Sequence, residues 1–393
     1  MGSVKKRPDG MWRARYRDDA KHEHARHFRR KIDAERWLST VEADMLRGTY
    51  VDPRAGRMSF REYAEQWRVG QVHRPTTQAQ LETHLRRHAY PYFGDRPINS
   101  VRSSELQAWV RRLSVLVDGK AMLAPATVEV VYRYVSAIFK AAVSDRLIVA
   151  SPCGGIRLPK IEPKRIKPIS TETVTQLRAA MVARCRELVM LGAGTGVRQG
   201  EAFAVELDHI DWLRRSLRVC QQLVLMPGEA PKIAPLKTAS SYRTIPLGAT
   251  IVDALAAHLA AFPVSPVEIE DTTGGGNVVR RSAHLLFVDD RGEPFRRTSF
   301  SRLVWQPARE SAGVAATVTF HDLRHYYASL LIRHNQSVKV VQARLGHASA
   351  AETLDTYSHL WPDDEDQTRQ AVDAVLGEIG TADQLRTEEG TGR

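Results

Sequence analysis

Two pairs of residues in the C-terminal half have the types and spacing needed to bind an anion and to move a proton. His321 and Arg324 lie three residues apart in a segment with helical periodicity, so they can present a proton donor and a cation to one oxyanion. Arg198 follows the turn Gly194-Thr195-Gly196 and opens another predicted helix, whose N-terminus itself favours an anion. Glu201, three residues further on, can hold the Arg198 guanidinium in place. These pairs predict a site for an anionic group.

Three further residues of useful chemical types lie in separate segments of the same half. Lys237 lies within residues 235–247, which are predicted to form a hairpin, although a lysine at a hairpin tip is usually only solvated. His347 directly follows a glycine that stops a predicted helix. Tyr357 lies near the end of the predicted folded unit. Only the folded chain can show whether they join the two arginines.

Two histidine groups raise the alternative of a metal site. His321 and His325 have the i, i+4 spacing of zinc ligands on a helix, but a metalloprotease helix places glutamate after the first histidine, where this chain has Asp322. No third ligand is obvious nearby. The other group is explained more simply by strand alternation among basic residues; it comprises His22, His24 and His27. We therefore expect no metal.

The elements that must position these residues form the largest predicted unit, residues 166–377. Its helices are expected at residues 170–185, 187–193, 251–261, 299–312, 320–334, 338–345 and 351–359. A small antiparallel sheet is expected from residues 214–224 and 232–247. Residues 264–284 look like an insertion without an assigned role, and their glycine run lacks the lysine and helix of a phosphate-binding loop.

Two smaller units precede this one. Residues 58–156 are predicted to form a compact bundle of helices at 60–69, 76–88, 103–113 and 125–145. Residues 1–54 are predicted to combine a β-hairpin with a helix at 33–46. An acidic tail, residues 378–393, ends the chain. The predicted fold class is mainly α with small antiparallel β-sheets (α+β).

Basic side chains mark two of these segments as candidates for binding nucleic acid. Arg13, Arg15 and Arg17 share one face of the predicted hairpin, where they suit phosphates, although a merely solvated strand face would have the same pattern. The connector between the second and third units is predicted to be extended and basic. Its basic residues are Lys160, Lys164 and Arg165.

Composition excludes several classes of protein. The 393 residues carry 57 Lys and Arg against 45 Asp and Glu, a net charge of +12. Nine of the acids and only three of the bases lie in residues 362–393, so residues 1–361 carry +18, which favours a polyanionic partner. No apolar run approaches a membrane span, and the N-terminus has no secretory signal. The three cysteines are far apart, as expected in a reducing cytoplasm.

Taken together, these segments resemble the tyrosine recombinase family, in particular the phage-type site-specific integrases. The resemblance spans nearly the whole chain. Its most specific part is the order of five motifs: Gly196-Val197-Arg198-Gln199-Gly200-Glu201, Lys237 in its predicted hairpin, His321-Asp322-Leu323-Arg324-His325, Leu345-Gly346-His347 and Tyr357. Residues 1–54 resemble the arm-type DNA-binding domain of integrases and residues 58–156 their core-binding domain. Those two likenesses rest on layout more than on diagnostic residues.

The resemblance implies a reaction in which Tyr357 attacks a DNA phosphodiester and forms a 3′-phosphotyrosyl bond. Arg198 and Arg324 would clamp the two non-bridging oxygens. His321 and His347 would add hydrogen bonds, with His321 the expected acceptor of the tyrosine proton. The departing 5′-oxygen would take its proton from Lys237. No cofactor, ATP or metal is expected, because the new bond conserves the phosphodiester energy and fixed cations neutralise the charge.

The resemblance also implies partners. Four protomers would exchange strands through a Holliday junction on duplex DNA with core and arm sites, in the cytoplasm of a bacterial host and in association with its nucleoid. An excision factor and a host DNA-bending protein are possible partners. An apolar face near the C-terminus could pack on a neighbouring protomer or on its own chain; it comprises Val372, Val375, Leu376 and Ile379.

Three alternatives stay open. A chromosome-dimer-resolving tyrosine recombinase would have the same chemistry, but such enzymes lack a basic N-terminal module. A silent DNA-binding regulator of the same fold would not need all six catalytic residue types. Tyr326 and Tyr327 are rivals of Tyr357 as nucleophile by residue type alone.

Overall fold

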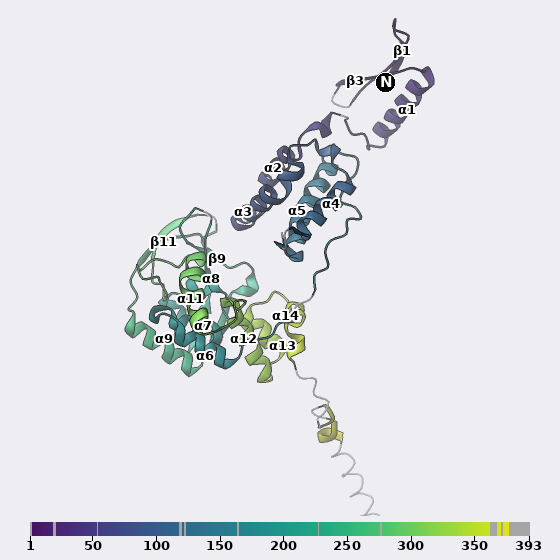
Figure 1. Ribbon diagram of the computed structural model, residues 1–393. Coiled ribbons are helices and arrows are strands. Elements are labelled where there is room, and N and C mark those ends of the chain that lie inside the picture. Colours follow the sequence, from purple (N-terminus) through teal and green to yellow (C-terminus); the bar gives the residue numbers. More distant parts are fainter. Residues whose placement is uncertain are drawn as a thin grey trace, which may run out of the picture. The chain divides into compact units, whose positions relative to one another are not determined.

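The computed structural model describes residues 2–18, 21–52, 54–117, 120–121, 123–162, 165–226, 228–275, 277–361, 368–370 and 372–376. The chain divides into two compact units, Met1–Pro163 and Lys164–Arg393 (Figure 1). Among these described residues no helix is both long and apolar enough to cross a lipid bilayer.

The first unit begins with a three-stranded antiparallel sheet, β1 (Ser3–Lys6), β2 (Trp12–Arg17) and β3 (Glu23–Phe28), in the order β1-β2-β3. Helix α1 (Lys31–Leu46) packs on this sheet. Ala14 and Tyr16 are buried beneath Ala34 and Leu38 of the helix, as strand alternation predicts. The central hairpin and the helix agree with the sequence-based prediction, whereas strand β1 was not predicted, because its short run of Lys and Val has no clear alternation.

The opposite face of β2 carries the three predicted DNA-binding arginines. Arg13, Arg15 and Arg17 all point toward Glu23 of β3, with N–O separations of 3.2, 3.8 and 3.9 Å. The arginines therefore form one positively charged strip with a single carboxylate at its centre.

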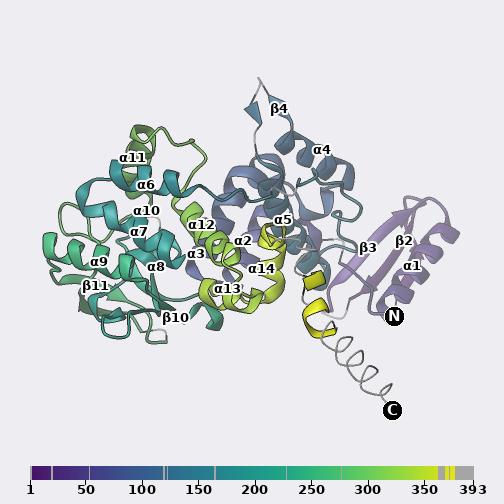
Figure 2. The ribbon, with the colours of Figure 1, turned by 90° about the horizontal axis from the view of Figure 1, so that it is seen from below.

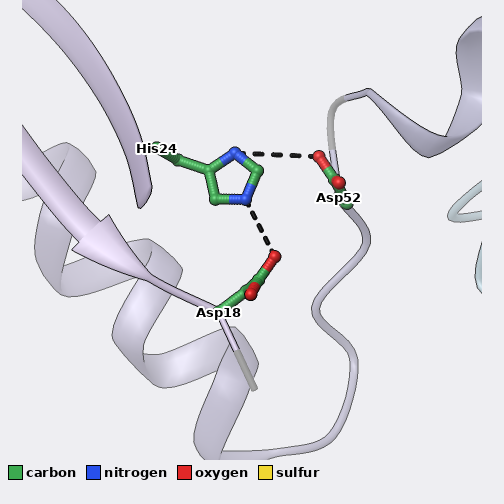
Figure 3. A group of neighbouring side chains, drawn as sticks. All are labelled: Asp18, His24 and Asp52. Atoms are coloured by element: carbon green, nitrogen blue, oxygen red, sulfur yellow. Dashed lines mark hydrogen bonds and ion pairs between the residues drawn. The ribbon is translucent and has the colours of Figure 1, made fainter. Parts of the chain in front are cut away.

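Figure 3 shows that His24 of β3 lies between two carboxylates. Its Nε2 is 2.9 Å from Asp18 Oδ2, and its Nδ1 is 3.7 Å from Asp52 Oδ1. The Asp18, His24 and Asp52 ligand atoms lie within 4.8 Å of one another, but each carboxylate faces a different ring nitrogen, whereas one metal ion takes one nitrogen of an imidazole. His22 and His27 are exposed. The arrangement fastens the segment after α1 to the sheet.

A helical bundle makes up the rest of the first unit. It comprises η1 (Ala55–Arg57), α2 (Phe60–Val69), α3 (Pro75–His84), the π-helical η2 (Leu85–Gly94), η3 (Ile98–Ser100), α4 (Ser103–Ser114), the short strands β4 (Leu116–Val117) and β5 (Lys120–Ala121), and α5 (Pro125–Ser144). The second predicted helix continues six residues beyond His88, through Pro91, because wider π-type turns accommodate a residue without an N–H. Its apolar core is separate from that of the sheet.

The second unit surrounds one large apolar core. Its helices are α6 (Thr171–Ala180), η4 (Ala183–Cys185), α7 (Arg186–Thr195), α8 (Gln199–Phe203), η5 (Leu207–His209), η6 (Ala239–Ser241), α9 (Ala249–Ala261), α10 (Arg297–Phe300), η7 (Ser301–Trp305), α11 (Gln306–Ser311), α12 (Phe320–Arg333), α13 (Val338–Leu345), α14 (Ala350–Tyr357) and η8 (Ser358–Leu360). Helix α12 packs on α7 and on α13, and α13 packs on α14 (Figures 1 and 2). These helices carry most of the candidate chemistry.

The strands of this unit form two sheets instead of the one predicted. One has the order β10-β7-β6, from β6 (Ile210–Asp211), β7 (Ser216–Val219) and β10 (Arg243–Pro246). The other has the order β12-β11-β9-β8, from β8 (Gln221–Val224), β9 (Lys232–Pro235), β11 (Val267–Asp271) and β12 (Val279–Ala283). The predicted hairpin over 235–247 is wrong, because η6 turns the chain from one sheet into the other.

The predicted insertion at 264–284 supplies β11 and β12, so it has a structural role. Strand β11 pairs parallel with β9, which departs from the expected all-antiparallel arrangement. Arg281 of β12 binds Asp271 at 2.6 Å and Glu206 at 2.6 Å, and its charge helps to hold the pKa of Glu206 at about 2 against the opposing effect of burial. The segment thereby completes the sheet and is fastened to the chain after α8.

Candidate active site

Arg198 is placed by a left-handed glycine. Helix α7 ends at Gly196, whose φ is +63°, and a Cβ there would lie 2.5 Å from the ring of Tyr327. Arg198 then caps α8: its backbone N–H donates to Glu201 Oε2 at 2.9 Å and its guanidinium pairs with Glu201 Oε1 at 2.8 Å. The sequence analysis expected this contact with Glu201.

A second arginine, Arg243, completes the environment of Glu201. Arg243 donates to Glu201 Oε2 at 2.8 Å, to the Arg344 carbonyl at 2.8 Å and to the Ser241 carbonyl at 2.9 Å. Burial opposes ionisation of Glu201, but the charges and hydrogen bonds of Arg243 and Arg198 outweigh it and hold its pKa below the usual value. Arg243 was not among the predicted site residues; the signal that could have found it is its spacing of two residues from buried Ile245, which places it on the inner face of β10.

Replacing Arg243 with methionine is expected to lower the free energy of unfolding by roughly 3–5 kcal/mol, because Glu201 loses a buried partner and two carbonyls lose their donor. Chemical denaturation of the full-length chain measures this loss. Arg214→Met is the matched control, because Arg214 is 87% exposed and 3.9 Å from Asp211. An equal loss in both variants would contradict the assignment.

Arg324 is the most enclosed cation of the described cluster. It is 2% exposed, and it donates to the Gly196 carbonyl at 2.8 Å and to the Leu345 carbonyl at 2.7 Å. These bonds join the segment before Arg198 to the end of α13. Burial, followed by repulsion from Arg198 and Arg243, lowers the pKa of Arg324. Both of these acceptors are neutral carbonyls, so this buried charge is well placed to attract an anion.

His347 is fixed by another left-handed glycine, Gly346, with φ +68°. The His347 ring is buried, its Nδ1 is 2.9 Å from Thr353 Oγ1, and it stacks on the Tyr357 ring with centroids 6.3 Å apart and planes 10° apart. Burial and then the Arg324 charge lower the pKa of His347 to about 4, so the ring is neutral at pH 7.

Tyr357 is the last residue of α14 and is 1% exposed. Its hydroxyl lies 2.8 Å from Nδ1 of His325. Burial raises the pKa of Tyr357 to about 12, although the nearby charges of Arg324 and Arg198 act in the opposite direction. The expected histidine at this position was His321, whereas His325 was weighed only as a metal ligand.

His321 lies one turn before His325 on α12. The two rings are perpendicular, with centroids 4.7 Å apart. The residue has an exposed face, yet desolvation of its ring, followed by repulsion from His325 and Arg324, lowers the pKa of His321 to about 4. At pH 7 the imidazole is therefore neutral and can donate a hydrogen bond to an incoming anion.

The two alternative nucleophiles, Tyr326 and Tyr327, have surroundings that differ from those of Tyr357. Tyr327 is buried against Gly196, and the Tyr326 hydroxyl lies 3.1 Å from Thr171 Oγ1 on α6. Tyr357 is the tyrosine that contacts two histidines.

Those of the remaining predicted site residues that the structure describes lie on the surface. Lys237 is exposed on the connection from β9 to η6, and η6 adjoins Gly346, so this connection lies beside the His347 segment. Lys160 and Arg165 are also exposed. Lys164 lies outside the described residues.

The buried arginines, neutral histidines and enclosed phenol, on a helical scaffold with small sheets, define an enzyme of the tyrosine recombinase class, which cuts and rejoins DNA. The chain belongs to the phage integrase family: the family pattern matches residues 161–363, and the patterns of the phage integrase N-terminal and central domains match residues 1–47 and 59–159.

Individual relatives agree with this family. An integrase of Mycobacterium phage D29 is 22% identical over 362 residues, covering 88% of this chain and 90% of its own. A tyrosine recombinase XerC-like protein of Caldanaerobacter subterraneus subsp. tengcongensis is 24% identical over 283 residues, covering 67% and 69%.

Solved structures share the fold. An integrase of transposon Tn1549, in complex with a circular intermediate DNA, has a TM-score of 0.62 and 23% identity over 81% of this chain and 99% of its own. A lambda integrase tetramer bound to a Holliday junction has a TM-score of 0.55 and 17% identity over 89% and 96%.

Proposed function

We propose that the chain is a site-specific DNA recombinase that integrates and excises mobile-element DNA through a 3′-phosphotyrosyl intermediate. The observation that carries the proposal is the position of Tyr357: its hydroxyl contacts His325, its ring stacks on His347, and the Arg324 charge lies near it. A phenol of raised pKa needs both a proton acceptor and cations to become a nucleophile. This cluster offers both.

The roles follow from where each group lies. Arg324, buried and hydrogen-bonded to two backbone carbonyls, and Arg198, held by Glu201, bind the two non-bridging oxygens and stabilise the charge that develops there. His321 and His347, both neutral, donate hydrogen bonds to the same oxygens. Lys237 protonates the departing 5′-oxygen, since its connection adjoins the His347 segment.

The predicted division of the chain fits this function. Residues 58–156 bind the core site and residues 166–377 carry out the chemistry, joined by the basic connector with Lys160, Lys164 and Arg165. Residues 1–54 bind the arm sites through Arg13, Arg15 and Arg17. The match of residues 1–47 to the phage integrase N-terminal domain favours a mobile-element integrase over a chromosome-dimer-resolving enzyme.

The assembly on DNA is a tetramer that resolves a Holliday junction in the host cytoplasm. In the described segment after α14, Val372, Val375 and Leu376 are 49%, 65% and 59% exposed, so they are available to a neighbouring protomer. Ile379 lies outside the described residues. An excision factor and a host bending protein would set the direction of the reaction.

The test is a denaturing gel of the protein after incubation, in EDTA, with nicked duplexes carrying the junction sequences that flank its gene. A protease-sensitive protein–DNA adduct is the expected result. Binding to every candidate site without an adduct would favour a silent regulator.

Deleting residues 1–54 is expected to abolish integration at full attachment sites while core-site cleavage on the nicked duplex stays within about threefold of the full chain. The reason is that the Arg13, Arg15 and Arg17 strip contributes arm contacts and none to the chemistry. Integration assays and adduct gels measure the two activities. Full integration by the truncated chain would instead support the chromosome-dimer-resolving alternative.

A further inference from the structure

The contact between Tyr357 and His325 joins the candidate nucleophile to a residue outside the predicted site set. His325 lies in the body of α12, directly after Arg324, whose bonds to the Gly196 and Leu345 carbonyls fix that turn of the helix. Tyr357 is held from the other side by the stacked His347 ring. The 2.8 Å separation of Tyr357 Oη and His325 Nδ1 therefore lies between two firmly placed groups.

The phenol needs a proton acceptor. With a pKa of about 12, roughly one Tyr357 side chain in 100,000 is ionised at pH 7, so the proton must leave as the hydroxyl attacks. Burial, followed by the Arg324 charge, lowers the pKa of His325 despite the opposing effect of Asp322. Its ring is therefore neutral at pH 7, and Nδ1 can accept when the ring hydrogen is on Nε2.

The other two histidines are less well placed to take this proton. The His347 ring lies parallel to the Tyr357 ring, so its nitrogens, whose lone pairs lie in the ring plane, are not directed at that phenol. Its Nδ1 is also engaged by Thr353. His321 lies one turn earlier on α12, with its ring perpendicular to that of His325, and is a neutral neighbour on the same helix face.

We propose that His325 is a catalytic residue, the base that accepts the Tyr357 proton. As Tyr357 Oη forms its bond to phosphorus and the bond from phosphorus to the 5′-oxygen breaks, the proton moves to His325 Nδ1, while Lys237 gives a proton to the 5′-oxygen. In rejoining, the 5′-hydroxyl attacks phosphorus and gives its proton back to Lys237, while the bond from phosphorus to Tyr357 Oη breaks and His325 returns its proton to Tyr357. This inference rests on the proposed function, and it leaves His321 to bind a phosphate oxygen.

The experiment compares His325→Ala and His325→Asn with wild type in the nicked-duplex adduct assay. Asparagine keeps a hydrogen-bond acceptor near the position of Nδ1 but cannot take a proton. His334→Asn is the matched control, because His334 is an exposed histidine at the end of the same helix. Both His325 variants are expected to form adduct about 10²–10⁴-fold more slowly, and the control at the wild-type rate.

A substrate with sulfur in place of the bridging 5′-oxygen separates the two proton transfers. A thiolate leaves without protonation, so this substrate is expected to restore Lys237→Ala and not the His325 variants. The wild-type rate is expected to fall below pH 6.5 as His325 gains its proton, and this acid limb should disappear in His325→Asn. The titratable and charged groups around His325 are His321, Asp322 and Arg324 on its own helix and Tyr357 on α14. Adduct formation at the wild-type rate in His325→Asn, or faster than wild type in His325→Ala, overturns the proposal.

A measurement on the unreacted protein separates this proposal from the proposed function. Nitrogen-15 histidine NMR of the full chain is expected to show His325 as the Nε2–H tautomer, with an Nδ1 signal that shifts in Tyr357→Phe. An Nδ1–H tautomer overturns the role of His325 even where wild type forms adduct. Absence of adduct in wild type, with the expected tautomer present, instead overturns the proposed function and, with it, the catalytic role. Circular dichroism confirms that the variants fold.

Discussion

Tyr357→Phe is expected to bind its DNA sites with wild-type affinity and to form no covalent adduct, a loss of at least about 10⁴-fold in strand cleavage. The substitution removes one oxygen. The buried ring and its stacking on His347 stay, and the lost hydrogen bond to His325 is worth about 1 kcal/mol of stability. A fold defect therefore cannot account for the loss of activity.

The measurement is a denaturing gel for the adduct beside a native gel for binding, on the same nicked duplexes. Tyr326→Phe is the matched control, because Tyr326 is a neighbouring tyrosine whose hydroxyl contacts Thr171 on α6. An adduct that survives in Tyr357→Phe would transfer the nucleophilic role to another tyrosine.

Arg324→Lys is expected to slow cleavage by about 10²–10³-fold. Lysine keeps the charge but lacks the planar fork that reaches two partners at once. One of the Gly196 and Leu345 carbonyls would lose its donor, at a cost of roughly 1–3 kcal/mol of stability, and the remaining ammonium could not also bind a phosphate oxygen. The defect is thus in both positioning and charge stabilisation.

Adduct formation rates on two substrates measure this prediction. Replacing one non-bridging oxygen at the cleavage site with a methyl group removes a negative charge, so the penalty of Arg324→Lys should shrink on that substrate. Arg333→Lys, at an exposed position of the same helix, is the control. An unchanged penalty on both substrates would show that Arg324 supports only the fold.

Patterns within short stretches of the sequence predicted many of the helices and strands and the faces that they bury. Alternation along β2 correctly predicted that Ala14 and Tyr16 lie in the core. Helical spacing predicted α12 and placed His321 and Arg324 on one face of it. The Arg198–Glu201 pair was predictable because its members are three residues apart. Each of these contacts is fixed by the geometry of a single element.

Contacts between distant elements were not predictable in the same way. Arg243 meets Glu201 across 42 residues, and His325 meets Tyr357 across 32. The parallel pairing of β11 with β9 likewise depends on where the chain returns, which hydrophobic alternation does not encode. Sequence motifs thus indicated the type of site, but only tertiary packing determines that His325 is the histidine in contact with the Tyr357 hydroxyl.

Glu23, at the centre of the β2 arginine strip, acts as a built-in counterion. An arginine surface usually holds mobile anions, and their release favours DNA binding. A phosphate arriving at this strip must displace a tethered carboxylate, which stays nearby and competes. Fewer ions leave per arginine neutralised, so the arm-site affinity that we propose for this strip should depend on salt less steeply than three arginines would suggest. The strip therefore adds little affinity for a duplex of arbitrary sequence, and more affinity for a site where several phosphates contact its arginines at once.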